Sequence, residues 1–153
     1  MKKIETREHV QAFLNSFLPK FDVWGIFFID RKKNDEAIAA LGITPAQRED
    51  VIRNIETDDY IETIVDEMSF GDMWVFGKDF SGEELYIKIS LGRPNSRTIC
   101  ISFHKSEFPN KYAFKEGNKS QKNTLTLRVL SPAARCMKFT MSRKRHSVER
   151  NIL

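Results

Sequence analysis

The feature that most constrains the fold is a change in hydrophobic periodicity at Asp72. From there apolar side chains recur at every second residue over three short segments, Asp72 to Phe80, Glu83 to Leu91 and Arg97 to His104. A two-residue period is typical of strands, because successive strand side chains point to opposite faces. The first two segments are joined by Ser81-Gly82 alone and the next two by a short Gly- and Pro-containing loop. This part of the chain therefore predicts an antiparallel meander.

The alternation also predicts which side chains share a face of this sheet. One face collects the large apolar residues, which need helices to cover them: Trp74, Phe76, Leu85, Ile87, Ile89, Ile99, Ile101 and Phe103. The other face carries Tyr86, Lys88, Ser102 and His104. An antiparallel sheet can leave one face uncovered, so we expect the polar face to be free for a ligand.

Helices are predicted in the first 65 residues. The segment Thr6 to Leu18 has apolar residues at helical spacing, with Thr6 as its cap and Pro19 as its end. The aromatic-rich segment Trp24 to Ile29 predicts a buried strand.

Two further helices follow this strand. The first begins at Asn34 or Asp35 and ends at Gly42, which suits the residue after a helix. The second begins with a capping box, Thr44-Pro45-Ala46-Gln47, and is expected to run to about Ile55.

Helices followed by an antiparallel meander define an α+β protein, with N-terminal helices packed on a three- or four-stranded sheet. The 153 residues suit one domain. Charge divides the chain: residues 1–110 have a net charge of −5, whereas residues 111–153 have +9. We therefore expect a domain over 1–114 and a partly flexible basic extension over 115–153. Such an arm either binds an anionic partner such as nucleic acid or is simply solvated.

Several classes of protein are excluded by what the sequence lacks. No apolar run approaches the roughly 20 residues of a membrane helix, and the N-terminus lacks the apolar centre of a secretion signal. We therefore expect a cytoplasmic protein without a membrane partner. The three histidines are scattered, and no metal or cofactor motif is present. Of the two cysteines, Cys100 fits a small buried strand residue.

The chemistry-bearing residues gather on the polar sheet face. Metal-independent RNA cleavage needs a 2′-hydroxyl deprotonated, a charged phosphorane stabilised and a 5′-oxygen protonated. Tyr86 and His104 can transfer the protons, and Lys88 can stabilise the phosphorane. Each residue taken alone also suits an ordinary strand surface, so the prediction rests on their shared face.

The same segments resemble the MqsR family of toxins. The resemblance covers about residues 8 to 114 and lies in a set of motifs that occur in family-like order: Thr44-Pro45-Ala46-Gln47-Arg48, Asp58-Asp59-Tyr60, Met73 to Lys78, Glu84 to Ile89 and Cys100 to His104. It implies a RelE-like fold, mRNA endoribonuclease activity and inhibition by a cognate antitoxin. It also implies an active-site Lys, Gln and Tyr. The Tyr matches Tyr86, while the Lys falls near Ile61 and the Gln near Val75.

The leading hypothesis is thus an endoribonuclease toxin that acts on single-stranded mRNA without a cofactor. Its catalytic residues are Tyr86, Lys88 and His104, and its RNA-binding residues are Lys78, Arg93, Arg97 and Lys105. The alternative is a toxin-like binding module without catalysis, which acts through a protein partner or through nucleic-acid binding.

Overall fold

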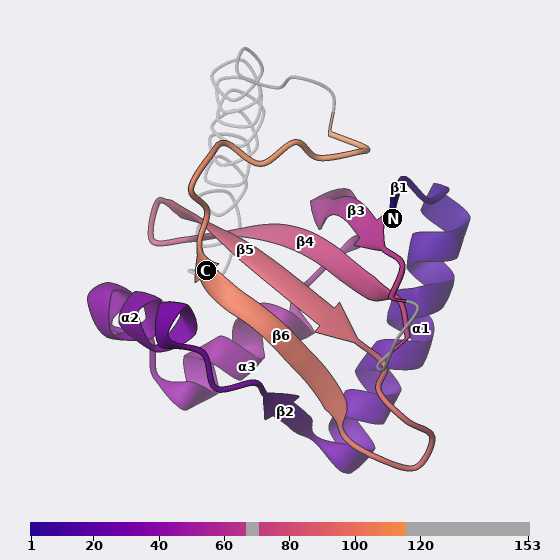
Figure 1. The fold of residues 1–153 in the computed structure, drawn as a ribbon, viewed down its shortest axis with the longest axis horizontal. Coiled ribbons are helices and arrows are strands. Elements are labelled where there is room, and N and C mark those ends of the chain that lie inside the picture. The colour runs from indigo at the N-terminus through magenta and orange to yellow at the C-terminus, as the bar shows by residue number, and fades with distance from the viewer. Residues whose placement is uncertain (67–70, 116–153) are drawn as a thin grey trace, which may run out of the picture. The chain divides into compact units, whose positions relative to one another are not determined.

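The structure is a computed structural model in which residues 1–66 and 71–115 are described (Figure 1). The elements, in chain order, are β1 (Lys2–Lys3), α1 (Arg7–Trp24), β2 (Ile26–Phe28), α2 (Lys32–Leu41), α3 (Pro45–Arg53), the 3-10 turn η1 (Thr57–Asp59), β3 (Tyr60–Ile64), β4 (Met73–Phe80), β5 (Glu83–Ser90) and β6 (Thr98–Lys105). The predictions for the basic extension beyond Lys115 lie outside the described residues.

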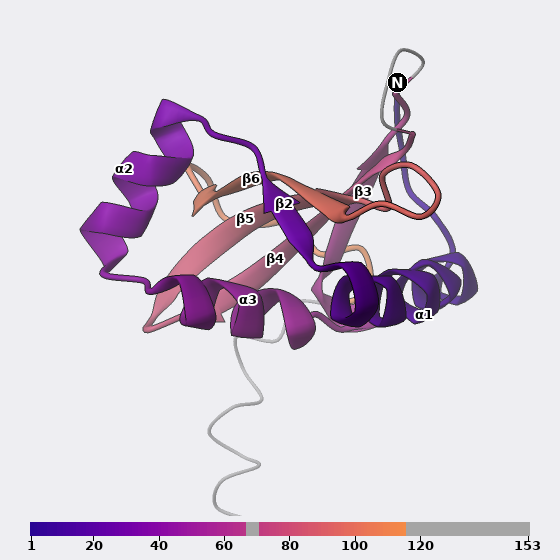
Figure 2. The same cartoon turned by 90° about the horizontal axis from the view of Figure 1, so that it is seen from below.

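The described strands form one sheet in the order β1-β3-β4-β5-β6-β2. All neighbours are antiparallel except β2 and β6, which are parallel. The α+β class is confirmed, but the sheet has six strands instead of three or four. The strands that the sequence did not predict are β1, which has only two residues, and β3, whose five residues show no clear two-residue alternation and contain a register shift after Tyr60. Helices α1 and α3 lie on one face, and α2 flanks the β6–β2 edge (Figure 2).

The predicted meander is confirmed, and so is most of its buried face. Ser81 and Gly82 form the β4–β5 turn with φ of 52° and 83°, as a two-residue hairpin requires. The core joins this sheet face to the apolar stripe of α1: Phe76, Leu85, Ile87, Ile89 and Phe103 from the sheet, and Val10, Phe13, Leu14, Phe17 and Phe21 from the helix.

Two side chains of the predicted core face, Ile101 and Ile99, were assigned wrongly, since neither belongs to the core. The β5–β6 register shifts between Lys88 and Ile89, so that Ile89 pairs with Cys100 and not with Ile101. Such a bulge inserts one extra residue and reverses the alternation beyond it. Cys100 therefore belongs to the core between the sheet and the helices. Ile101 is also buried but is not part of that core. Cys100 is 1% exposed, which confirms the predicted buried residue, and burial raises the pKa of its thiol to about 12, so the thiol stays protonated.

Helix α1 continues through Pro19 to Trp24, so the predicted end at Pro19 was wrong. Proline lacks an N–H and leaves the carbonyl four residues earlier unpaired, but that residue, Asn15, is exposed to water. The extra turns bury Phe21 in the core. The helix instead ends at Gly25, whose φ of 78° suits glycine and whose N–H donates to the Phe21 carbonyl oxygen at 2.8 Å.

The signals for α2 and α3 were partly confirmed. Thr44 and Gln47 form the predicted capping box, and Gly42 ends α2 with a φ of 63°. Asn34, however, lies inside α2, where its side chain donates to the Ile29 carbonyl and accepts from the Phe103 N–H. The predicted strand over Trp24 to Ile29 forms at a sheet edge and is not buried, since Phe27 is 53% exposed.

The residues after β6, which we call the crossing segment (106–115), traverse the polar face from β6 to β3. Asn110 Nδ2 donates to the Leu85 carbonyl oxygen at 3.1 Å, and Ala113 N donates to the Tyr60 carbonyl oxygen at 2.9 Å. A β carbon at Gly77 would lie 2.5 Å from Asn110 Nδ2 and 2.7 Å from the Tyr112 hydroxyl, so glycine lets the segment approach. Among the described residues no helix is long and apolar enough to cross a membrane.

Candidate active site on the open sheet face

Strands β5 and β6 bring the three predicted catalytic residues together. Tyr86 lies directly opposite His104, and Lys88 follows two residues later on the same face. The Tyr86 and His104 rings stack with their centroids 5.2 Å apart and their planes at 19°. The Lys88 Nζ lies 5.9 Å from the Tyr86 ring centroid. The shared face predicted from the alternation is therefore a real cluster.

The polar ends of this cluster are available for a ligand. Within the described part of the chain, neither the Tyr86 hydroxyl nor Lys88 Nζ has a hydrogen-bond or ion-pair partner. His104 Nδ1 lies 2.8 Å from the Lys105 carbonyl oxygen. A carbonyl can only accept, so Nδ1 carries the proton, and in the neutral ring Nε2 is the basic nitrogen. His104 thus presents a proton acceptor to the open face.

Burial and nearby charges shift the pKa values of Lys88 and Tyr86. Burial lowers the pKa of Lys88, and the positive charges of Arg31 and Lys2 lower it further, while Glu62 acts in the opposite direction. Burial also raises the pKa of Tyr86, with a further contribution from the Glu62 carboxylate. The repulsion between Lys88 and the neighbouring cations favours an anion bound between them. The Tyr86 phenol, with its raised pKa, keeps its proton at neutral pH.

Sequence reasoning missed three residues of this surface: Arg31, Lys2 and Glu62. Lys2 and Glu62 form an ion pair of 2.7 Å across β1 and β3. Arg31 precedes α2, and its charge acts on Lys88. Nothing local in the sequence links these positions to β5, because Lys2 lies on a two-residue strand, Glu62 on the unpredicted strand β3, and Arg31 in the connection before α2.

The four predicted RNA-binding residues are not part of the cluster. Lys78 lies on the helix-packed face, where Nζ contacts Asp59 Oδ2 and the Asn54 carbonyl, both at 2.7 Å. Lys105 pairs with Glu83 at 2.6 Å. Arg93 and Arg97 lie in the β5–β6 loop, at the end of β5 away from Tyr86.

A cavity of about 590 Å³ opens beside Tyr86 and His104. Its other walls come from β3, from the first turn of α2 and from the crossing segment. These walls contribute the side chains of Glu62, Lys33, Phe108 and Lys111. The polar face is therefore only partly free, since the crossing segment covers Gly77 and forms one side of the cavity.

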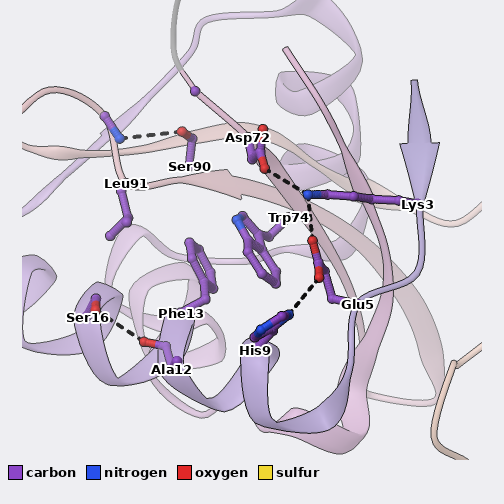
Figure 3. Close-up of a pocket in the computed structure, with 12 residues that line it drawn as sticks. Lys3, Glu5, His9, Ala12, Phe13, Ser16, Asp72, Trp74, Ser90 and Leu91 are labelled. Carbon is purple, nitrogen blue, oxygen red and sulfur yellow. Dashed lines mark hydrogen bonds and ion pairs between the residues drawn. The ribbon is translucent and has the colours of Figure 1, made fainter. Parts of the chain in front are cut away.

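A second cavity, of about 700 Å³, lies between α1, the start of β4 and the end of β5 (Figure 3). Phe13 and Trp74 stack in its wall with centroids 4.3 Å apart. Its charged groups satisfy one another: Glu5 contacts Lys3 at 2.6 Å and His9 at 3.0 Å. Because these groups are paired, this cavity is a weaker candidate for chemistry than the open face.

No group of three or more His, Cys, Asp or Glu side chains in residues 1–66 and 71–115 is arranged to hold a metal ion. The fold and the site thus define an α+β protein with a Tyr–Lys–His cluster on a partly covered sheet face. Comparison of the chain with protein-family models, curated proteins and solved structures found no match.

Proposed function

We propose that the protein is a metal-independent endoribonuclease, which cleaves single-stranded mRNA in the cytoplasm as the toxin of a toxin–antitoxin system. One observation carries the proposal. Tyr86, Lys88 and His104 share the open sheet face, and the hydroxyl, the ammonium and the Nε2 atom that they present there have no partner among the described residues. None of the three is a buried orphan, so each can exchange its water for a ligand, and together they suit phosphodiester cleavage.

The roles follow from the protonation of each group. His104 Nε2 accepts the proton of a ribose 2′-hydroxyl, and the 2′-oxygen attacks the neighbouring phosphorus. Tyr86, whose raised pKa keeps it protonated, donates its proton to the departing 5′-oxygen as the phosphorus–oxygen bond breaks. The products are a 2′,3′-cyclic phosphate and a 5′-hydroxyl. Only RNA supplies the internal nucleophile.

Lys88 and Arg31 stabilise the phosphorane. The charge of Arg31 lowers the pKa of Lys88, so a phosphate that binds between the two cations relieves their repulsion. Fixed cations aimed at developing negative charge are a large source of catalysis. Lys2 adds to the same positive field, although its ammonium is already paired with Glu62.

The resemblance to MqsR toxins supports the same proposal and adds a RelE-like fold and an antitoxin partner to it. Helices on one face and an antiparallel meander with Tyr86 on the other agree with that fold. Ile61 and Val75 stand where the resemblance places a Lys and a Gln. These apolar residues favour a second candidate, an RNA-binding module without catalysis.

Cleavage of a labelled single-stranded RNA in the presence of EDTA separates the two candidates. The wild-type protein should yield 2′,3′-cyclic phosphate ends. We expect Tyr86→Phe, Lys88→Ala and His104→Ala each to lower the rate at least about 100-fold, the lower bound for a positioned acid or base and for a fixed group that stabilises developing charge. Their melting temperatures should stay within a few degrees of wild type, because these side chains lie outside the core.

Matched controls are His9→Ala and Lys32→Ala, which remove an exposed histidine and lysine from helices. These variants should cleave at the wild-type rate. A triple variant of Tyr86, Lys88 and His104 that still cleaves as fast as wild type would refute the proposed site. Binding of RNA without any product would instead support the binding module.

The toxin assignment has its own test in cells. Induced expression should arrest growth, and co-expression of the neighbouring reading frame should restore it if that frame encodes the antitoxin. Growth that is arrested equally by the His104→Ala variant would separate toxicity from RNA cleavage.

A further inference from the structure

Phe108 is an exposed aromatic residue held at a defined place beside the candidate active site. It is 77% exposed, yet it lines the same cavity as Tyr86 and His104. A single exposed ring is common on protein surfaces, but this one lines a cavity whose other wall presents the Tyr86 hydroxyl and the His104 ring, and that combination can bind a ligand.

The backbone around Phe108 is tied down on both sides. Ser106 N donates to the Glu84 carbonyl oxygen at 2.7 Å, and the Ser106 hydroxyl donates to the Phe108 carbonyl oxygen at 2.6 Å. Two residues later, Asn110 N donates to Glu84 Oε2 at 3.0 Å. These bonds anchor the crossing segment to the start of β5, so Phe108 is presented from a fixed wall.

Two lysines at or beside the cavity, Lys111 and Lys88, are available to bind an anion. Lys33, from the first turn of α2, pairs with Glu107. Lys111 is exposed and has no ion pair with another described residue. Lys88, on the neighbouring sheet face, is likewise unpaired among the described residues, whereas Glu62 and Glu107 in the cavity wall are paired with Lys2 and Lys33. Protein sites for single-stranded nucleic acid combine these same two features, a cationic surface for phosphates and aromatic faces for bases.

We propose that the cavity between Tyr86, His104 and Phe108 is a nucleobase subsite for single-stranded RNA, in which one base stacks on Phe108. This inference rests on the proposed function, because it places the base next to the phosphate that Lys88 and His104 engage. Every base has a face that can stack, so Phe108 contributes affinity and positioning more than sequence selection. Bases of a duplex are already stacked on their neighbours, which makes single strands the substrate class.

Binding to an RNA that cannot be cleaved tests the subsite separately from catalysis. The probe is a fluorescent 2′-O-methyl RNA 10-mer, in which the nucleophile is blocked, together with variants that lack one base at each position in turn. With wild-type protein, removal of one particular base should weaken binding about tenfold, the effect of a single base–aromatic stack. In Phe108→Ala, the intact oligomer should bind about tenfold more weakly. In this variant, removal of that same base from the oligomer should no longer weaken binding further.

Two further variants sharpen the result. Phe108→Trp should keep the penalty, since it retains an aromatic face. Phe27→Ala, which removes another half-exposed phenylalanine from the remote strand β2, should bind like wild type. Phe108→Ala with wild-type affinity, an unchanged penalty in that variant, or no binding of the oligomer by wild type would each overturn the inference.

Failure of the subsite and failure of the proposed function give different results. If the base-removal pattern depends on Phe108 but no RNA is cleaved, the subsite stands and catalysis falls. If RNA is cleaved and Phe108→Ala behaves like wild type in both assays, the proposed catalysis is supported and the base subsite is refuted.

Discussion

Gly77→Ala tests whether the crossing segment is an integral part of the fold. The new β carbon would lie 2.5 Å from Asn110 Nδ2 and 2.7 Å from the Tyr112 hydroxyl, closer than unbonded atoms approach. Both side chains must move away. They would lose the 3.1 Å bond from Asn110 to the Leu85 carbonyl and the 3.4 Å bond from Tyr112 to Glu84 Oε1.

Two such hydrogen bonds at about 1 kcal/mol each predict a loss of roughly 2 kcal/mol. For a domain of this size the loss corresponds to a fall in melting temperature of about 8 °C. Thermal unfolding followed by circular dichroism measures the global effect. Hydrogen exchange at the Ala113 amide, which donates to Tyr60, measures whether the segment itself has loosened.

A background with both Asn110→Ala and Tyr112→Ala is the control, because it removes the atoms that the new β carbon would meet. There the Gly77→Ala change should cost almost nothing, so the effects should be strongly non-additive. Equal costs in both backgrounds, or an unchanged Ala113 exchange rate, would show that the close approach at Gly77 does not hold the segment.

Two further predictions concern stability. Ile87→Ala should cost about 2–5 kcal/mol in urea unfolding, since Ile87 is fully buried in the core; a cost below about 1 kcal/mol would contradict the assigned face. Lys78→Met should cost roughly 2 kcal/mol at pH 7, less than removal of a sole partner, because Lys115 also contacts Asp59. Burial opposes ionisation of Asp59, but its bonds to Lys78, the Glu56 amide and Lys115 outweigh burial and lower its pKa. A lowered folded-state pKa stabilises the fold above the unfolded value near 3.9, and this contribution is lost as the pH falls through the folded pKa. The gap between wild type and Lys78→Met should therefore persist at pH 7 and shrink below about pH 4; a gap independent of pH would rule out the ion pair as its cause.

Local sequence signals determined the parts of the fold that depend on neighbouring residues. The capping box at Thr44 and the turn at Ser81-Gly82 act within four residues, and the structure has both. The two-residue period of the meander likewise placed Tyr86, Lys88 and His104 on one face, because strand geometry alone decides that outcome. The candidate catalytic cluster could thus be predicted before any tertiary structure was known.

Other features depend on contacts between distant segments, which no local pattern encodes. Pro19 stays inside α1 because Phe21 gains burial in the core, and the bulge that exchanges Ile101 for Cys100 arises from the pairing of two whole strands. Arg31 and Phe108 reach the open face only because α2 flanks β6 and the chain after β6 folds back over Gly77. Lys78 was assigned to RNA by its charge, whereas its partner Asp59 comes from a segment 19 residues earlier. Alternation and capping are short-range properties of a chain, while the surroundings of a charge or an exposed ring are decided by what tertiary packing brings beside it.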